Sequence, residues 1–302
     1  MKRPVLLIVL VAFSLACAAL PLPGSPSSPH LPTTLPTEPP ASPELVATPA
    51  PVAGLPAPGS ALVLFGVKED QTLALRAEPA GGDALAELSI TASDLVFTGE
   101  AVQLAGETWL AIDHAGVQGW LPAMHLIELT PAEDFCNDPQ VALLVADVMA
   151  ALALEDGAAL AALTSPTHGL YLRHNWWNNE VWVAPHNVAG VFADPTVLDW
   201  GVSDGSGEPI LGDFSTVLLP GLQEVVAAPT RELHCDDLEN GSGPSSGFKI
   251  PPPAYQNANY MVVYRPAGPQ DNEFDWRSFA FGIETIDGQP YLLYIVMYRW
   301  EI

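Results

Sequence analysis

The chain has 302 residues, of which 10 are Lys or Arg and 35 are Asp or Glu, so its formal net charge is −25. This charge repels phosphate backbones and anionic lipid surfaces, and no cluster of basic residues interrupts it. The composition therefore argues against nucleic-acid binding. It is compatible with cationic partners or Ca²⁺, or with an acidic surface that serves only solubility.

An apolar segment of about a dozen residues, Val5 to Ala16, follows two basic residues at the N-terminus. It is typical of a signal peptide and is shorter than the ~20 residues that span a bilayer as a helix. Its end, Phe13-Ser14-Leu15-Ala16-Cys17, resembles bacterial lipoprotein signals. The resemblance implies a signal peptide over 1–16 and a lipid on Cys17, hence an extracytoplasmic protein anchored to the cell membrane or outer membrane. Ordinary signal cleavage at Ala16-Cys17-Ala18 is the alternative and would give a secreted protein.

Three cysteines occur in the chain. With Cys17 assigned to the lipid, Cys136 and Cys235 are the one possible intramolecular pair, and an oxidising compartment would preserve their disulfide. We predict this bond, with two free buried thiols as the alternative. Removal of Lys2 and Arg3 with the signal would shift the net charge from −25 to about −27.

The segment from Leu20 to Ser60 contains 13 prolines together with many Ser, Thr and Ala residues. Repeated prolines favour polyproline II at about 3.1 Å per residue and leave too little apolar surface for a core. We therefore expect residues 17–60 to form a disordered, lipid-anchored linker that reaches roughly 120 Å at full extension. A PxxP ligand for a partner domain is the alternative.

From Ala61 the pattern changes to short alternating runs separated by Gly, Asp and Glu, which predicts a small β-barrel or sandwich. The predicted strands are 62–67, 72–76, 84–90, 94–102, 108–114 and 117–121.

Several short motifs in this region resemble the bacterial Src-homology-3 domain over residues 61–129. They are Leu73-Ala74-Leu75-Arg76-Ala77-Glu78-Pro79, Leu85 to Leu88, Glu107 to Ile112, and Gly119-Trp120-Leu121-Pro122 with Leu126. Ala74 and Glu78 stand where the family has Asn and Gly. The resemblance implies a small all-β barrel that recognises cell-wall peptides or positions a neighbouring domain. Its candidate ligand-binding residues are Trp109, Trp120, Arg76 and Asp113, with core packing as the alternative for the two tryptophans.

A second unit, residues 131–302, is long enough for its own core. Asp138-Pro139 predicts a helix start, and six apolar residues then share one helical stripe: Val141, Leu144, Val145, Val148, Met149 and Leu152. A second helix runs from Asp156-Gly157 to Leu163. Strands are predicted at 169–174 and 180–183, helices at 186–193 and 214–226, and long loops at 195–209 and 236–253.

The chain ends in a predicted hairpin, 276–286 and 289–302, with a type I′ turn at Asp287-Gly288. Tyr291, Leu293, Ile295 and Met297 are expected on one face, and Leu292, Tyr294, Val296 and Tyr298 on the other, so the last strand should be buried on both sides. A helix pair followed by strands and this hairpin resembles the cystatin-like, nuclear-transport-factor-2-like cone. The predicted fold class is thus multidomain: an all-β barrel followed by an α+β domain.

The mouth of such a cone can hold a ligand. Tyr171, His174, Trp176 and Trp177 are the candidate lining residues, with aromatic core packing as the alternative. His168 and His174 lack the spacing and acidic neighbours of a zinc site.

Two serine-nucleophile motifs and one calcium-loop motif occur in the chain, but their surroundings do not match those of functional sites. Gly201 to Gly205 and Gly243 to Gly247 both read G-x-S-x-G, but neither has a strand before it and a helix after it. Asp204, Ser206 and Glu208 have the spacing of a calcium loop, but Pro209 replaces the turn glycine. We therefore assign no catalytic residue, metal or cofactor.

The sequence favours a non-catalytic binding or scaffolding lipoprotein of the cell envelope, with peptidoglycan or envelope proteins as partners and the membrane reached through its lipid. A hydrolase or lyase with a pocket in the C-terminal domain is one alternative. A purely structural envelope protein is the other.

Overall fold

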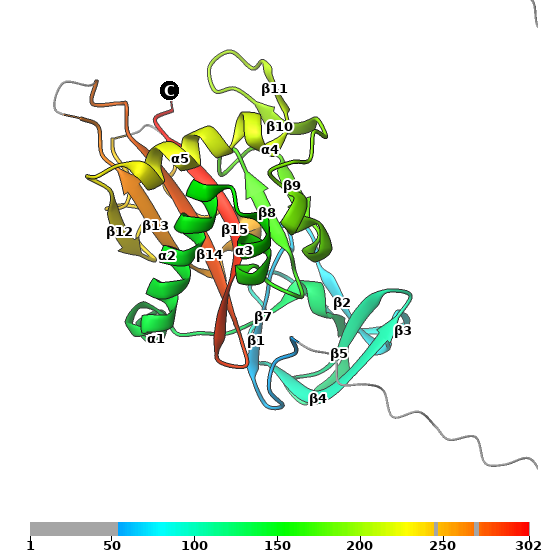
Figure 1. The fold of residues 1–302 in the computed structure, drawn as a ribbon. Coiled ribbons are helices and arrows are strands. Elements are labelled where there is room, and N and C mark those ends of the chain that lie inside the picture. Colours follow the sequence, from blue (N-terminus) through cyan, green and yellow to red (C-terminus); the bar gives the residue numbers. More distant parts are fainter. Residues whose placement is uncertain (1–53, 245–246, 269–271, 302) are drawn as a thin grey trace, which may run out of the picture. The chain divides into compact units, whose positions relative to one another are not determined.

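The computed structural model describes residues 54–244, 247–268 and 272–301, which form a mostly β structure with a few helices (Figure 1). These residues belong to one compact unit. The predicted signal peptide, the lipid site Cys17 and the linker up to residue 53 lie outside the described residues. Among the residues described, none of the helices is both long and apolar enough to cross a bilayer.

Residues 61–128 form a curled antiparallel sheet of seven strands, here called the N-terminal sheet. In spatial order the strands are β3 (Gly81–Leu88), β2 (Leu73–Glu78), β6 (Val117–Pro122), β5 (Glu107–His114), β4 (Leu95–Leu104), β1 (Ala61–Leu64) and β7 (Leu126–Glu128). The six predicted strands correspond to β1 to β6 within a few residues, whereas β7 was not predicted.

The inner side of this sheet is aliphatic. Alternate residues such as Leu75, Leu110 and Ile112 point into a buried cluster, as the period of two in a strand requires. Residues that precede the first strand also pack on this sheet, because Leu55 contacts the cluster and the Gly59 amide donates to the Phe97 carbonyl at 2.8 Å. The last residues of the predicted linker are therefore packed on the sheet. The sheet and these residues are here called the N-terminal lobe.

Three helices follow the N-terminal sheet: α1 (Ala132–Asn137), α2 (Pro139–Leu154) and α3 (Gly157–Leu163). Asp138 caps α2 by accepting a hydrogen bond from the Gln140 amide at 2.8 Å, and Asp156 caps α3 in the same way from Ala159. The predicted apolar stripe of α2 is buried along its whole length. Both predicted helix starts are confirmed, whereas α1 was not predicted.

The second sheet, here called the C-terminal sheet, has six strands in the order β12-β13-β14-β15-β8-β9. The strands are β8 (Leu170–Arg173), β9 (Glu180–Val183), β12 (Glu232–Cys235), β13 (Asn259–Arg265), β14 (Arg277–Ile286) and β15 (Gln289–Arg299). Strands β15 and β8 are parallel, and the other neighbours are antiparallel. The C-terminal sheet and the helices of residues 131–302 are here called the C-terminal lobe. The two lobes together make a mixed α+β structure.

Two predictions between the sheets were wrong in part. The predicted loop 195–209 contains strand β10 (Leu198–Val202), which pairs with β11 (Pro209–Gly212). The predicted helix 186–193 is a 3₁₀ segment, Pro185–Gly190, in which Asn187 and the terminal Gly190 have low α-helix propensity. The helix predicted at 214–226 is present as α4 (Phe214–Val217) and α5 (Leu219–Ala227).

The final hairpin is confirmed, with positive φ at both Asp287 and Gly288, as a type I′ turn requires. Strand β15 is buried on both faces, but the predicted division of its residues is wrong near Leu292. A bulge opposite Gly282 shifts the register, so Leu292 lies with Ile295 and Met297, and Leu293 lies with Tyr294 and Val296.

The two faces of the C-terminal sheet have different cores. Helices α2 and α5 cover one face, where Phe279, Phe281 and Ile295 join an aliphatic cluster (Figure 1). The other face carries tyrosines and receives Phe65 from the end of the N-terminal sheet; this ring stacks on Tyr255 at 5.1 Å between centroids. The lobes therefore share a core.

Hydrogen bonds also cross between the two lobes. The side-chain amide of Asn257 donates to the backbone carbonyls of Leu64 and Ile90 at 2.9 and 2.7 Å. The backbone amide of Asp287 donates to the Glu128 carboxylate at 2.9 Å. The two part-buried bonds of Asn257, between groups far apart in the chain, favour one arrangement of the two sheets.

Candidate functional site

A cavity of about 540 Å³ lies between the N-terminal sheet and the segment around β9. Its volume falls in the range of small-molecule sites. The N-terminal lobe lines it with Leu55, Gln103, Gly106, Glu107, Thr108, Ala123 and Met124. The C-terminal lobe lines it with Pro166, Thr167, Trp182, Ala184, Pro185 and His186.

Trp182 is the largest side chain in this cavity. It lies on β9, an edge strand in which Val181 points into the core, so the period of two turns Trp182 outward. The side chain is 51% exposed, and its indole Nε1 donates to the His168 carbonyl at 2.7 Å. Because this bond uses the ring's one polar group and fixes the indole, the free part of Trp182 is an apolar π face.

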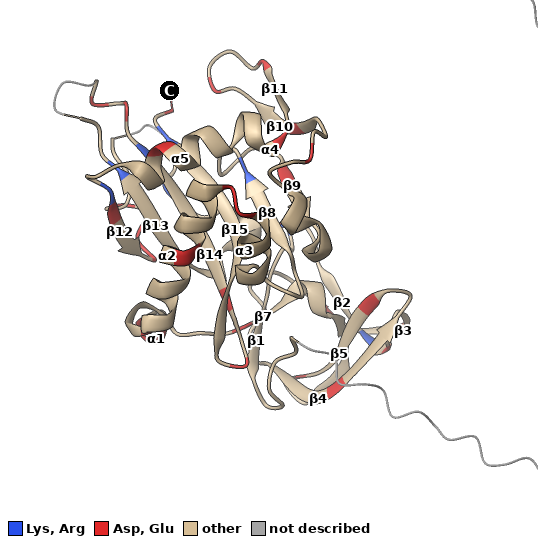
Figure 2. Cartoon of the chain, viewed as in Figure 1, with Lys and Arg blue, Asp and Glu red and all other residues tan. Residues whose placement is uncertain are grey.

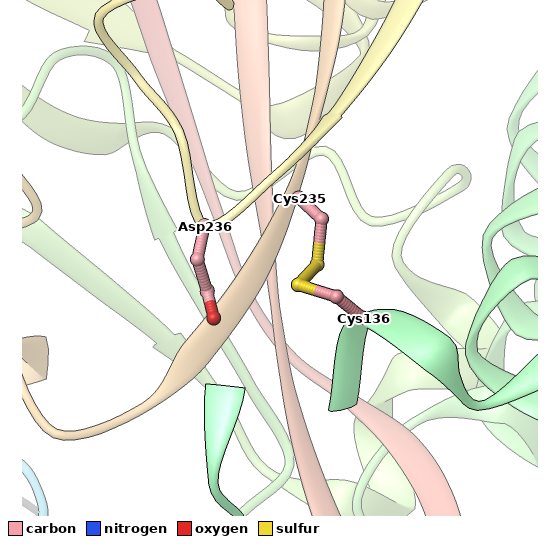
Figure 3. A group of neighbouring side chains, drawn as sticks. All are labelled: Cys136, Cys235 and Asp236. Carbon is pink, nitrogen blue, oxygen red and sulfur yellow. A yellow bond between two sulfur atoms is a disulfide. The ribbon is translucent and has the colours of Figure 1, made fainter. Parts of the chain in front are cut away.

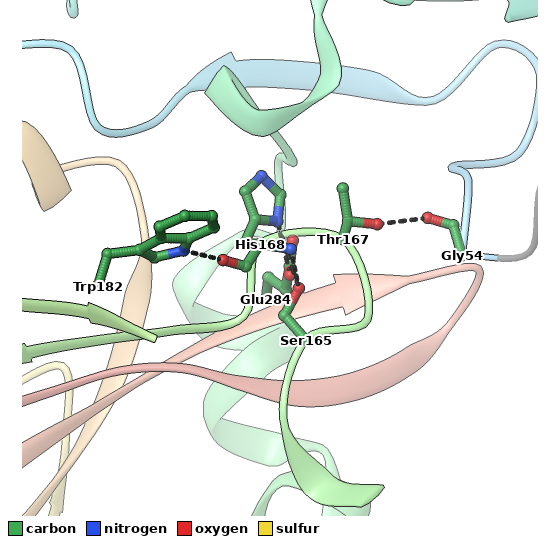
Figure 4. Close-up of polar contacts among 6 residues, drawn as sticks. All are labelled: Gly54, Ser165, Thr167, His168, Trp182 and Glu284. Carbon is green, nitrogen blue, oxygen red and sulfur yellow. Dashed lines mark hydrogen bonds and ion pairs between the residues drawn. The ribbon is translucent and has the colours of Figure 1, made fainter. Parts of the chain in front are cut away.

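The loop that contains His168, whose carbonyl accepts the Trp182 hydrogen bond, is held in place by a buried polar cluster (Figure 4). His168 Nδ1 lies 2.9 Å from a carboxylate oxygen of Glu284, and both side chains are almost fully buried. The Ser165 hydroxyl accepts a hydrogen bond from the His168 amide at 2.8 Å, and Thr167 donates to the Gly54 carbonyl at 3.0 Å. These bonds hold the loop before β8 in place and thereby position the His168 carbonyl under the indole.

Ser165, His168 and Glu284 are the residue types of a nucleophilic relay, but their geometry is not that of one. Such a relay needs the carboxylate on one ring nitrogen and the serine on the other. Here Ser165 Oγ, at 3.4 Å, and Glu284 both face Nδ1, while Nε2 has no hydrogen-bond partner among the described residues. The cluster therefore lacks the arrangement of a relay, and its bonds support the loop before β8.

The polar residues of the cavity are acidic or neutral. Glu107 is its acidic member, and Gln103, Thr108, Thr167 and His186 contribute amide, hydroxyl and imidazole groups. Among the described residues that line it, none is Lys or Arg. Figure 2 shows the same imbalance over the drawn chain, in which acidic segments are spread over both lobes and basic ones are few. The cavity therefore suits a neutral or cationic ligand better than an anion.

The candidate residues of the N-terminal sheet do not line this cavity. Trp109 is 6% exposed and pairs with Pro122 across β5 and β6. Trp120 pairs with Arg76 and borders a separate hollow of about 370 Å³, whereas Asp113 accepts a hydrogen bond from the Gly116 amide in the adjacent turn.

The candidate residues of the C-terminal lobe are also dispersed. Tyr171 is part of the tyrosine face, where its ring lies 5.2 Å edge-on from Phe65. The pKa of His174 is lowered to about 4 because burial and the nearby Arg299 and Arg277 disfavour its charged form.

Trp176 and Trp177 lie near the end of β15, and Trp176 packs against the cluster of tyrosines that includes Tyr171. The Trp176 ring packs edge-on against the exposed Phe248 at 5.7 Å. The indole of Trp177 donates to Glu301 at 2.6 Å, and its ring borders a hollow of about 220 Å³ beside β10. These residues form a rim at this end of the sheet and do not line one common pocket with Tyr171.

The serine and calcium motifs lie in non-catalytic surroundings. Gly201 to Gly205 forms the end of β10 and the turn to β11, so no helix follows Ser203. Asp204, Ser206 and Glu208 lie in the same turn, where the Ser203 amide donates to the Glu208 carbonyl at 2.8 Å. Part of the second serine motif lies outside the described residues.

The predicted disulfide between Cys136 and Cys235 is present and joins α1 to β12 (Figure 3). Asp236 follows it and, with the two sulfur atoms, is the one cluster of metal-ligand type within 54–244, 247–268 and 272–301. Bonded sulfurs are not thiolate ligands, so the cluster is not a metal site. Burial raises the pKa of Asp236 to about 6, although the Tyr260 amide donates to this carboxylate.

No motif in the sequence groups the cavity residues Glu107, Met124, Trp182 and His186. The alternation Val181-Trp182-Val183 does predict one outward tryptophan on a short strand. This alternation cannot predict which residues of the N-terminal lobe line the cavity, because those residues precede Trp182 by more than fifty positions.

Comparisons of the chain with protein-family models, with curated proteins and with solved structures yield no match.

Proposed function

We propose that this protein is a lipid-anchored, extracytoplasmic binding protein of the cell envelope and that its ligand is a peptide of the cell wall. The observation that carries the binding role is the cavity of about 540 Å³ between the lobes, with the fixed and half-exposed Trp182 in its wall. A preformed cavity with an apolar face and a few polar groups is the usual form of a ligand site.

The envelope location in this proposal rests on the apolar N-terminal segment with Cys17 and on the proline-rich linker. The disulfide between Cys136 and Cys235 supports it, since such bonds persist in oxidising compartments. In this proposal the N-terminal sheet is a Src-homology-3-like barrel, and the C-terminal sheet with its helices is a nuclear-transport-factor-2-like cone. The curled seven-stranded sheet and the helix-covered six-stranded sheet are compatible with these two folds.

A membrane preparation and a cosedimentation assay test the two parts of the proposal. The intact mass of the mature protein from membranes should equal that of residues 17–302 plus a diacylglyceryl group, minus two hydrogens for the disulfide. The processed protein should sediment with isolated cell walls, and Trp182→Leu should reduce the bound fraction several-fold. The matched control Trp177→Leu changes an exposed tryptophan outside the cavity and should bind normally. A protein that stays in the supernatant with walls of its own host would refute the binding role.

A further inference from the structure

We infer that the cavity at Trp182 recognises an alkylammonium group, such as a lysine side chain, whose charge lies over the indole face and beside Glu107. This inference rests on the proposed function, because it names the chemical group that the same cavity takes.

The indole supplies the first element of such a site. Its N–H is already bonded to the His168 carbonyl at 2.7 Å, so Trp182 cannot offer that donor to a ligand. The exposed π face remains, and a tryptophan face attracts ammonium groups, the more strongly the further these groups are desolvated. The ring does not have to be ordered when the ligand binds, which reduces the entropic cost of binding.

Charge supplies the second element. Glu107 is the acidic residue of the lining within the part of the chain that the structure describes, and neither Lys nor Arg accompanies it in that part. The chain as a whole carries 35 acidic and 10 basic residues, so its long-range field also attracts cations. An anionic ligand would face repulsion from both sources, whereas a cation would be attracted by both.

The apolar walls supply the third element. Leu55, Met124, Pro166 and Pro185 line the same cavity. An alkyl chain can pack against such side chains while its charged end reaches a polar group, which is how long basic side chains bury their stems. The combination of apolar wall, indole face and one carboxylate thus fits an ammonium on an aliphatic stem better than a polar ligand without one.

The first test titrates the full mature chain with the peptide acetyl-Ala-Lys-Ala-amide and with its Nε-acetylated twin, which differs in charge and in the added acetyl group. The lysine peptide should bind at least ten-fold more tightly, and its affinity should fall several-fold between 20 and 300 mM NaCl. Trp182→Leu should weaken binding about ten-fold and Glu107→Gln about three-fold. The controls Trp177→Leu and Glu100→Gln, both outside the cavity, should leave the affinity unchanged.

A second test uses isolated cell walls before and after acetylation of their free amines. We expect acetylation to abolish sedimentation of the protein. Equal binding to both preparations, or equal affinity for the two peptides, would overturn the amine inference and leave wall binding intact; a neutral saccharide would then be the better ligand. Failure to bind either wall preparation would instead refute the proposed function itself. Thermal melts of each variant identify any loss of binding that is due to unfolding.

Discussion

On one face of the C-terminal sheet, helices α2 and α5 cover Phe279 and Phe281, whereas on the other face Phe65 of the N-terminal sheet stacks on Tyr255. The helix-covered face is built within one lobe and is mainly aliphatic. The tyrosine face combines groups from both lobes, and its phenols need partners, such as the Ile250 carbonyl that accepts from Tyr298 at 2.9 Å. Packing within a lobe therefore stabilises the first face, and packing between lobes stabilises the second.

Gly282 shows how closely the tyrosine face is packed. A Cβ at this position would lie 2.0 Å from the Tyr294 ring, so the aromatic ring occupies the space that a side chain would need. Tyr255 stacks on the same ring at 4.7 Å between centroids. Phe65, Tyr255 and Tyr294 thus form one continuous stack that starts in the N-terminal sheet and ends on β15.

The largest expected loss of stability comes from replacing one buried phenylalanine by alanine on each face of the C-terminal sheet. Phe65→Ala and Phe281→Ala should each lower the free energy of unfolding by about 3–5 kcal/mol, the usual cost of a buried phenylalanine. We expect Phe65→Ala to split the thermal transition in calorimetry, because the lobes lose their shared ring, and Phe281→Ala to keep a single transition. If Phe65→Ala melts in one transition with a loss below about 1 kcal/mol, the shared core does not couple the lobes.

A somewhat smaller effect is expected from the disulfide, whose Cys235 packs against the helix-covered core. The bond closes a loop of 99 residues, and such cross-links typically contribute about 2–4 kcal/mol. The double variant Cys136→Ser with Cys235→Ser should lose this amount in urea unfolding, and reduction of the native protein should give the same value. A change in the variant that reduction does not reproduce would show that the serines, and not the missing bond, destabilise it.

The smallest expected change in stability comes from Asp236, which lies beside the tyrosine face, and it depends on pH. Its folded-state pKa is raised to about 6 from an ordinary 3.8, so it contributes stability below about pH 4 that is lost as the pH rises through 6. Asp236→Asn keeps the acceptor for the Tyr260 amide and tolerates the positive φ of 48°. The variant should match the native protein near pH 4 and exceed it by about 1–2 kcal/mol at pH 8.

Urea unfolding of the two proteins at several pH values measures this difference. An advantage of Asp236→Asn that is the same at every pH would contradict the assignment, because a difference of that kind does not come from titration. A loss of stability at pH 8 would show that the carboxylate is stabilised in the fold.

Local signals predicted much of this structure. Asp138-Pro139 marks the start of α2, Asp287-Gly288 marks the last turn, and alternating apolar residues mark β1 to β6. Long-range pairing was not predictable in the same way. Strand β12 has four residues and is a strand through its pairing with β13. The register near Leu292 depends on a bulge in β15, opposite Gly282, that sequence alternation cannot reveal.

The candidate site was harder to predict for a related reason. Single aromatic residues attract attention in a sequence, but Tyr171 and Trp109 are used for packing. Trp182 becomes a ligand candidate because Thr108 and Met124, far away in the chain, face it across a cavity. The disulfide could be predicted because the number of cysteines left one pairing.

The central claim is that ligand binds in the cavity at Trp182 and not on the outer side of the N-terminal sheet at Trp120. The chain has eight tryptophans, each with an indole N–H that gives its own signal in a nitrogen-15 NMR spectrum. We predict that soluble cell-wall peptides shift the Trp182 signal, assigned with Trp182→Leu, and leave the Trp120 signal in place. A spectrum in which Trp120 shifts and Trp182 does not would contradict the account.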